Sequence, residues 1–175
     1  MSLRHGALMA GIAVLALILG FAAANWLRQP VEPETGAAQS LLSIELPDTE
    51  NRLQSLKQFQ GKTLVVNFWA TWCPPCRDEI PHFVQAQRDL AANNVQFVGI
   101  ALDDPVQVAA FALEMNINYP ILMGGLHEQE ALRKLGNPSG GLPYTLIFDK
   151  TGQLREKIIG GLDQRRLQQA LAPHF

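Results

Sequence analysis

Two cysteines, Cys73 and Cys76, are the residues whose type and spacing point most directly to chemistry. They are the only cysteines of the chain, and two prolines, Pro74 and Pro75, separate them. Cysteines three positions apart at the first turn of a helix can close a small disulfide ring, and the helix N-terminal amides stabilise a thiolate on the first of them. The thiolate is the nucleophile of thiol–disulfide exchange. The pattern therefore predicts that an accessible Cys73 attacks and that Cys76, one turn further in and more protected, resolves the mixed disulfide.

Other uses of this pair stay open at this point. A purely structural disulfide would close a very short loop and would stabilise the fold little. A metal site would need more ligands, and the sequence offers neither a second cysteine pair nor a His-x-x-His motif. We interpret His82 and His127 as surface residues. A peroxidase would favour the spacing Thr-x-x-Cys, whereas Thr71 stands two positions before Cys73.

The residues around the cysteines predict a strand, a turn and a helix. Residues 64–69 (LVVNFW) form a short, nearly continuous apolar run, which is typical of a strand buried on both faces. Pro75 suits the first turn of a helix, where no amide donor is needed. The helix is expected over residues 76–92, with a kink at Pro81.

The rest of the chain continues this alternation and predicts an α/β fold with a mixed central sheet and helices on both faces. The helix over 105–116 is expected to bury Val106, Val108, Phe111 and Leu113, among other apolar residues. The further expected strands are 95–102, 119–123, 144–148 and 154–159, and the further helices are 128–135 and 163–172.

The segment from Val65 to Pro81, VVNFWATWCPPCRDEIP, resembles the active-site strand and helix of the TlpA/ResA/CcmG group. These are membrane-anchored, extracytoplasmic, thioredoxin-like proteins. The segment Gly141–Thr145 is similar to the cis-proline loop of thioredoxin folds. The resemblance covers roughly residues 41–172. It implies a thioredoxin-like fold whose redox group is the Cys73–Cys76 disulfide, with no other cofactor and no metal.

The resemblance also assigns roles to individual residues. Pro143 is expected to be cis, to face the disulfide and to offer backbone groups to an extended substrate segment. Glu79 matches an acidic residue that helps to move the proton of the resolving thiol, and burial there would raise its pKa. Asn67 stands where thioredoxin has a buried aspartate, so proton transfer would fall to Glu79 or water. Substrate contacts are expected from Trp72, Pro74, Pro75, Leu142 and Pro143.

Composition and the N-terminus suggest where the domain works. The chain has 14 basic and 16 acidic residues, a net charge of −2 and no basic stripe, which argues against a nucleic-acid partner. Residues 7–24 carry no charge and could form about 27 Å of helix, close to the thickness of a bilayer core. A cleavable signal sequence ending near Ala22–Ala24 competes with this anchor. We expect an anchor or signal over 1–28, a linker over 29–40 and a thioredoxin-like domain over 41–175.

These observations predict an extracytoplasmic thiol:disulfide oxidoreductase on the periplasmic side of the inner membrane. Its expected partners are cysteine-containing extracytoplasmic proteins, which it would reduce, and a membrane thiol-electron donor. Cytochrome c maturation is the setting that the resemblance implies. A disulfide oxidase or isomerase, and a metal carrier, remain as alternatives.

Overall fold

The computed structural model describes residue 16, residues 19–21 and residues 33–174 of the chain. Residues 1–32 and 33–175 form two separate units. The anchor or signal sequence predicted over residues 1–28 lies almost wholly outside the described residues, of which 16 and 19–21 are helical. Within the described ranges, no helix is both long enough and apolar enough to cross a membrane.

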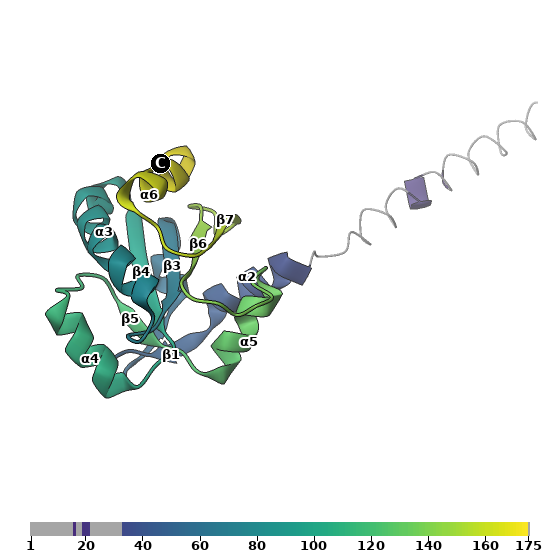
Figure 1. Ribbon diagram of the computed structural model, residues 1–175. Coiled ribbons are helices and arrows are strands. Elements are labelled where there is room, and N and C mark those ends of the chain that lie inside the picture. Colours follow the sequence, from purple (N-terminus) through teal and green to yellow (C-terminus); the bar gives the residue numbers. More distant parts are fainter. Residues whose placement is uncertain (1–15, 17–18, 22–32, 175) are drawn as a thin grey trace, which may run out of the picture. The chain divides into compact units, whose positions relative to one another are not determined.

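A five-stranded mixed sheet forms the centre of the second unit (Figure 1). Its strands are β3 (Thr63–Trp69), β4 (Val95–Ala101), β5 (Ile121–Met123), β6 (Tyr144–Phe148) and β7 (Leu154–Ile159). They stand in the order β5-β4-β3-β6-β7. Strands β3, β4 and β5 are parallel, and β6 is antiparallel to both β3 and β7. The predicted mixed sheet is confirmed.

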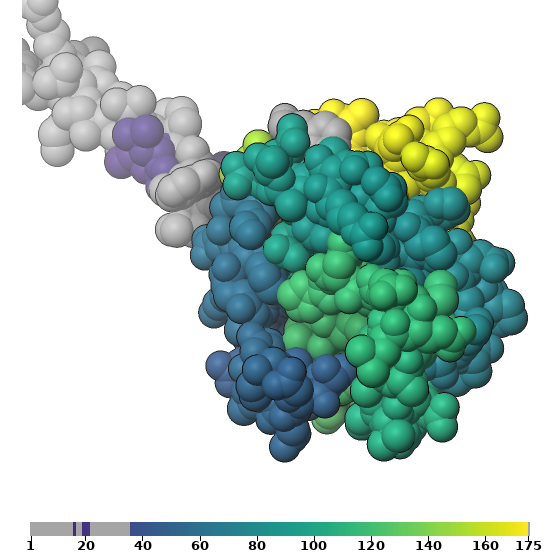
Figure 2. All heavy atoms as spheres, turned by 90° about the vertical axis from the view of Figure 1, so that its left-hand side faces the viewer, coloured from purple at the N-terminus to yellow at the C-terminus, as the bar shows by residue number. Residues whose placement is uncertain are grey.

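Helices cover both faces of this sheet (Figure 1). They are α2 (Pro33–Ser43), α3 (Pro74–Leu90), α4 (Pro105–Glu114), α5 (Leu126–Lys134) and α6 (Gln164–Leu171), with the short 3-10 helices η1 (Leu56–Phe59), η2 (Ala91–Asn93) and η3 (Ala172–His174). One apolar cluster joins α3, α4 and α6 to the sheet through residues such as Ile80, Phe111 and Leu167. A second cluster joins α2 and α5 through residues such as Leu41 and Leu132. Figure 2 looks onto the side that carries α3 and α4, with the yellow C-terminal segment along its upper edge.

Strand β3 owes its apolar sequence to its central place. All seven of its residues are buried, because it has a strand on each side and helices above and below. The predicted run 64–69 therefore lies where a strand with two covered faces is expected. The chain leaves β3 at Trp69 and reaches Cys73 four residues later, which places the cysteines at the carboxyl end of the central strand.

Helix α4 corrects the expectation about which apolar residues are buried. Its start is as predicted, because the Asp104 side chain accepts hydrogen bonds from the amides of Val106 and Gln107. Val108 and Phe111 are buried, but Val106 and Leu113 are 74% and 81% exposed. At 3.6 residues per turn, positions 106 and 113 share one face and positions 108 and 111 share roughly the opposite one. The four residues therefore cannot all face the core.

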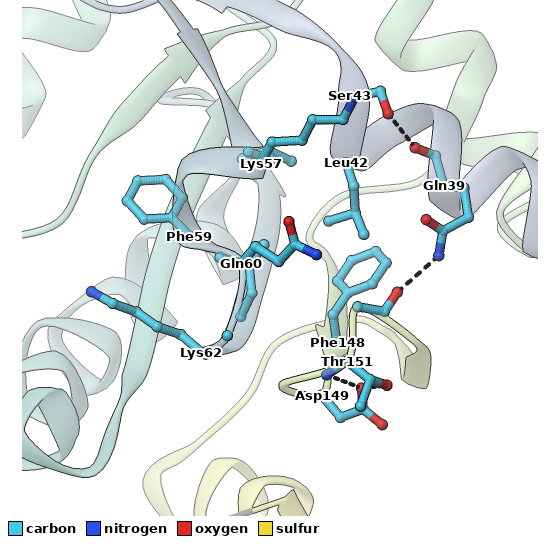
Figure 3. Close-up of a pocket in the computed structure, with 14 residues that line it drawn as sticks. Gln39, Leu42, Ser43, Lys57, Phe59, Gln60, Lys62, Phe148, Asp149 and Thr151 are labelled. Carbon is cyan, nitrogen blue, oxygen red and sulfur yellow. Dashed lines mark hydrogen bonds between the residues drawn. The ribbon is translucent and has the colours of Figure 1, made fainter.

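Residues 33–40 do not belong to a linker, which corrects the expected start of the folded domain. They form most of α2, in which Ala38 and Leu41 are 1% and 3% exposed. The Gln39 side chain also donates a hydrogen bond of 3.0 Å to the carbonyl of Gly152, in the turn between β6 and β7 (Figure 3). Small and apolar residues on one helical face let α2 pack closely, although proline, glutamate and glycine in this stretch suggested a linker.

A small hairpin that the sequence did not predict covers one edge of the sheet. It consists of β1 (Glu45–Pro47) and β2 (Leu53–Ser55), which pair antiparallel. Just after β1, Asp48 forms an antiparallel bridge with Leu122 of the edge strand β5. The opposite edge is β7, along which half-buried and exposed side chains alternate.

Candidate active site

A disulfide joins Cys73 and Cys76 at the start of α3. Cys73 is the N-cap of the helix, and its carbonyl accepts hydrogen bonds from the amides of Cys76 and Arg77 at 3.1 and 3.2 Å. The cysteines therefore stand at the first turn of a helix that follows a buried strand, as predicted. Cys73 is only 3% exposed and Cys76 is fully buried, so the expectation of an accessible Cys73 is wrong for this oxidised form. Both residues belong to the apolar cluster under α3, which shields them from solvent.

The loop before the cysteines is fixed by the neighbouring parallel strand. The backbone amide and the hydroxyl of Thr71 donate to the same carboxylate oxygen of Asp103 at 2.9 and 2.5 Å. The amide of Leu102 donates to the carbonyl of Trp69 at 2.9 Å. Partial burial acts to raise the pKa of Asp103, but hydrogen bonds from Thr71 and Asp104 outweigh it and lower the pKa. Sequence reasoning missed this pair, although polar residues after adjacent parallel strands were a signal for it.

The carboxylate of Glu79 lies inside the protein, one turn beyond Cys76. The Glu79 residue is 1% exposed. Its Oε1 accepts a hydrogen bond of 2.8 Å from the Asn67 amide, and its Oε2 accepts one of 2.9 Å from the backbone N–H of Leu162. Burial raises the pKa of Glu79 to about 7, against the opposing effects of these two hydrogen bonds and of the Arg166 charge. The burial of Glu79 is thus more complete than the partial burial that the sequence predicted.

Asn67 connects Glu79 to the sheet. It lies opposite Thr145 in the β3–β6 register, and its Nδ2 donates to the Thr145 hydroxyl at 3.0 Å as well as to Glu79. Asn67 and Thr145 are 2% and 0% exposed. Neither of these two side chains titrates in the physiological range, so Glu79 is the titratable member of this buried trio.

The peptide bond between Leu142 and Pro143 is cis, as predicted. Pro143 is buried immediately before β6, and its carbonyl accepts a hydrogen bond of 2.9 Å from Gly160. Leu142 packs against the apolar cluster that contains both cysteines. The expected contact between Pro143 and the disulfide stays a prediction.

Exposed residues stand immediately before Cys73 and between the two buried cysteines, and we call them the exposed rim. Trp72 is 67% exposed, and Pro74 and Pro75 are exposed as well. Trp69, by contrast, is fully buried and packs against the Phe111 ring, with 5.5 Å between ring centroids. The substrate contacts assigned to Trp72, Pro74 and Pro75 remain predictions, but these residues are available to a partner.

The hollow in Figure 3 lies elsewhere. It measures about 100 Å³ and is lined by residues of α2, of the segment from η1 into β3 and of the β6–β7 turn, including Lys62 and Phe148. These residues mark the opposite end of β3 and β6 from the cysteines, and none of the predicted site residues lines the hollow. Over the described part of the chain, no cluster of three histidine, cysteine or carboxylate side chains could hold a metal ion.

The comparisons with known proteins agree with this geometry. The AhpC/TSA family matches residues 37–157. The thiol-disulfide oxidoreductase ResA of Geobacillus thermodenitrificans is 29% identical over 72% of this chain and 71% of its own length. The thiol:disulfide interchange protein DsbE of Pseudomonas aeruginosa is 32% identical over 86% of this chain and 81% of its own.

A solved structure extends the likeness to three dimensions. The thiol:disulfide interchange protein of the thioredoxin family from Chlorobium tepidum superposes with a TM-score of 0.68. It is 30% identical, and the alignment covers 75% of this chain and 92% of that one. Together with the disulfide at the start of α3, these likenesses establish that the chain belongs to the AhpC/TSA family and is a thiol–disulfide oxidoreductase with a thioredoxin-like fold.

Proposed function

We propose that this protein reduces disulfides in other extracytoplasmic proteins through the Cys73–Cys76 pair. The observation that carries the proposal is the buried carboxylate of Glu79, held one turn beyond a cysteine pair at a helix N-terminus. A group with a pKa of about 7 can both take up and release a proton near neutral pH, which suits general acid–base work.

The reaction has two displacement steps. In the dithiol form, the Cys73 thiolate attacks one sulfur of a partner disulfide, a mixed disulfide forms, and the partner's other sulfur leaves as a thiolate. Glu79 accepts the proton of the Cys76 thiol, directly or through water. The Cys76 thiolate then attacks the sulfur of Cys73 and the second partner sulfur leaves. The partner gains two electrons and two protons overall, and the protein ends as the disulfide seen in this structure.

The setting is proposed from the sequence. The uncharged run 7–24 is long enough to hold the domain at a membrane, with a cleaved signal as the alternative. A membrane thiol-electron donor would return two electrons to the Cys73–Cys76 disulfide after each cycle. The resemblance to the TlpA/ResA/CcmG group supports haem-binding cysteines of cytochromes c as substrates. Trp72, Pro74 and Pro75 form an exposed rim that supports docking of such partners.

The reduction potential of the Cys73–Cys76 couple tests the direction of the reaction. Equilibration of the soluble domain with glutathione or dithiothreitol buffers gives this potential. We expect a value nearer the reducing thioredoxin range, about −270 mV, than that of strong protein oxidants, about −120 mV. A reduction potential near about −120 mV would contradict the proposed reductase and would indicate a disulfide oxidase instead. Trapping with Cys76→Ser, followed by identification of the proteins held as mixed disulfides, then identifies the partners.

A further inference from the structure

One short loop touches several parts of the site. This loop, residues 160–163, connects β7 to α6. The amide of Gly160 donates to the carbonyl of Pro143, and the amide of Leu162 donates to Glu79. Gly161 passes so close to the start of α3 that a Cβ placed on it would lie 3.4 Å from the carbonyl oxygen of Pro75. The loop therefore meets the cis-proline segment, the cysteine motif and the buried carboxylate.

A single side chain holds the central peptide group of this loop. Nη1 of Arg166, in the first turn of α6, donates a hydrogen bond of 2.6 Å to the carbonyl oxygen of Gly161. That carbonyl and the N–H of Leu162 belong to the same peptide group. Because the peptide group is planar and almost always trans, its oxygen and its N–H point in opposite directions. Arg166 thus binds one end of a rigid unit whose other end binds Glu79 at 2.9 Å.

We propose that Arg166 is a positioning residue for Glu79, which acts through the Gly161–Leu162 peptide group. Its guanidinium fixes the plane of that group and polarises it, so that the Leu162 N–H stays aimed at Oε2 of Glu79. Hydrogen bonds in series strengthen one another, and a charged donor at the start of the series adds to the effect. The inference rests on the proposed function only in giving this carboxylate a part in proton transfer.

The surroundings of Glu79 explain why this arrangement matters. Both of its oxygens accept from N–H donors, those of Asn67 and Leu162, and this pattern suits the ionised carboxylate. Within the described residues, Arg166 and the Tyr119 phenol interact electrostatically with Glu79, and Cys76 stands one turn before it on the same helix. Burial raises the pKa of Tyr119 and the negative charge of Glu79 raises it further, so that phenol stays neutral. Arg166 is the cation in this set, and its loss weakens the bond that favours the charged carboxylate.

The test compares Arg166→Gln with Arg165→Gln. Both positions are exposed and adjacent on α6, and each substitution removes one positive charge. The titration of the Glu79 carboxyl carbon is followed by NMR in the oxidised protein, where no thiol titrates. We expect Arg166→Gln to raise the midpoint of the Glu79 titration by about 0.5 to 1 pH unit, because the ionised Glu79 carboxylate loses part of its stabilisation. Arg165→Gln should move it much less.

The backbone amide of Leu162 gives a second reading that a purely structural role would not change. Its proton signal should follow the ionisation of Glu79 in the unaltered protein, and the size of this pH-dependent change should fall in Arg166→Gln. If that variant folds poorly, Arg166→Met, which keeps the aliphatic stem, replaces it. Equal effects of the two glutamine variants, or an unchanged Leu162 signal in Arg166→Gln, would overturn the proposal.

The same variants separate this inference from the proposed function. The rate at which a small dithiol reduces the Cys73–Cys76 disulfide is measured across pH for the unaltered protein and for Arg166→Gln. If the Glu79 titration and the rate profile move together, both proposals hold. If the titration moves and the profile does not, Arg166 still positions Glu79, but Glu79 has no part in exchange.

Discussion

Two ends of the same sheet each hold a carboxylate surrounded by hydrogen-bond donors, and the two carboxylates behave in opposite ways. At the β6–β7 turn, Asp149 accepts bonds from Thr151, Gln153 and Arg155. Slight burial acts to raise its pKa, but these bonds dominate and the pKa falls far below its usual range. At the cysteine end, Glu79 accepts two bonds and its pKa rises to about 7.

The difference lies in the balance between burial and donors. Asp149 is only partly buried and accepts four hydrogen bonds, one of them from the charged Arg155 guanidinium, and together these bonds outweigh the effect of burial. Glu79 has lost its hydration, and two donors do not replace it. The comparison assigns a structural task to the carboxylate in the turn and a titrating task to the carboxylate beside the cysteines.

The largest expected effect is the loss of exchange when the cysteine end is altered. Cys73→Ser should abolish reduction of a partner disulfide, because no nucleophile remains, while Asp149→Asn should leave the rate unchanged. Cys76→Ser should allow the first displacement and then stop, so that mixed disulfides accumulate. Rates with a disulfide-containing protein substrate and non-reducing gels measure both outcomes. Substantial turnover by Cys73→Ser would show that exchange does not depend on the cysteine end of the sheet.

Replacement of Glu79 by glutamine sharpens the comparison through pH. A carboxyl whose pKa is raised by folding binds its proton more tightly in the folded state, so stability falls as the pH rises from the unfolded value of about 4.5 towards about 7. Glu79→Gln should remove this fall, which is on the order of 3 kcal/mol at most. Urea unfolding between pH 4 and 8 measures it.

The same variant should alter how the exchange rate depends on pH. With Glu79 in place, we expect an inflection near neutral pH that belongs to the coupled group of Glu79 and the thiols. Glu79→Gln removes one member of that group, so the inflection should move or disappear. An unchanged rate profile, together with an unchanged stability slope, would show that Glu79 does not titrate in this range.

The smallest expected effect belongs to Asp149→Asn. Its lowered pKa means that the ionised form stabilises the fold above the unfolded-state pKa of about 3.9, and this stabilisation is lost as the pH falls below that value. The variant should lose about 1 kcal/mol of stability at pH 7, a modest value because the site is solvated. Its deficit relative to the unaltered protein should shrink below about pH 4. A deficit that grows at low pH would contradict the comparison.

Much of the site was predictable because its signals are local. The run 64–69 identified the central strand, the Cys-Pro-Pro-Cys spacing identified the disulfide, and the cis bond before Pro143 followed from a resemblance. The start of α2 was missed because its buried side chains, such as Ala38, are small and weak as signals. The contact between Glu79 and Leu162 spans 83 positions and uses a backbone N–H. Any residue type except proline can donate a backbone N–H, so the sequence could not predict this contact. For the same reason it could not predict that Arg166 binds the other end of the same peptide group.

The edges of the sheet bear on how the protein behaves at high concentration. A free edge strand is a template on which another copy can add a strand, and this is a route to aggregation. The β1–β2 hairpin protects one edge through the bridge between Asp48 and Leu122. The other edge, β7, exposes Arg155 and Lys157 in alternation with half-buried neighbours. Charged side chains on an edge strand disfavour the addition of a second copy, so the arginine and lysine of β7 work against sideways growth of the sheet in a domain that passes through repeated redox cycles.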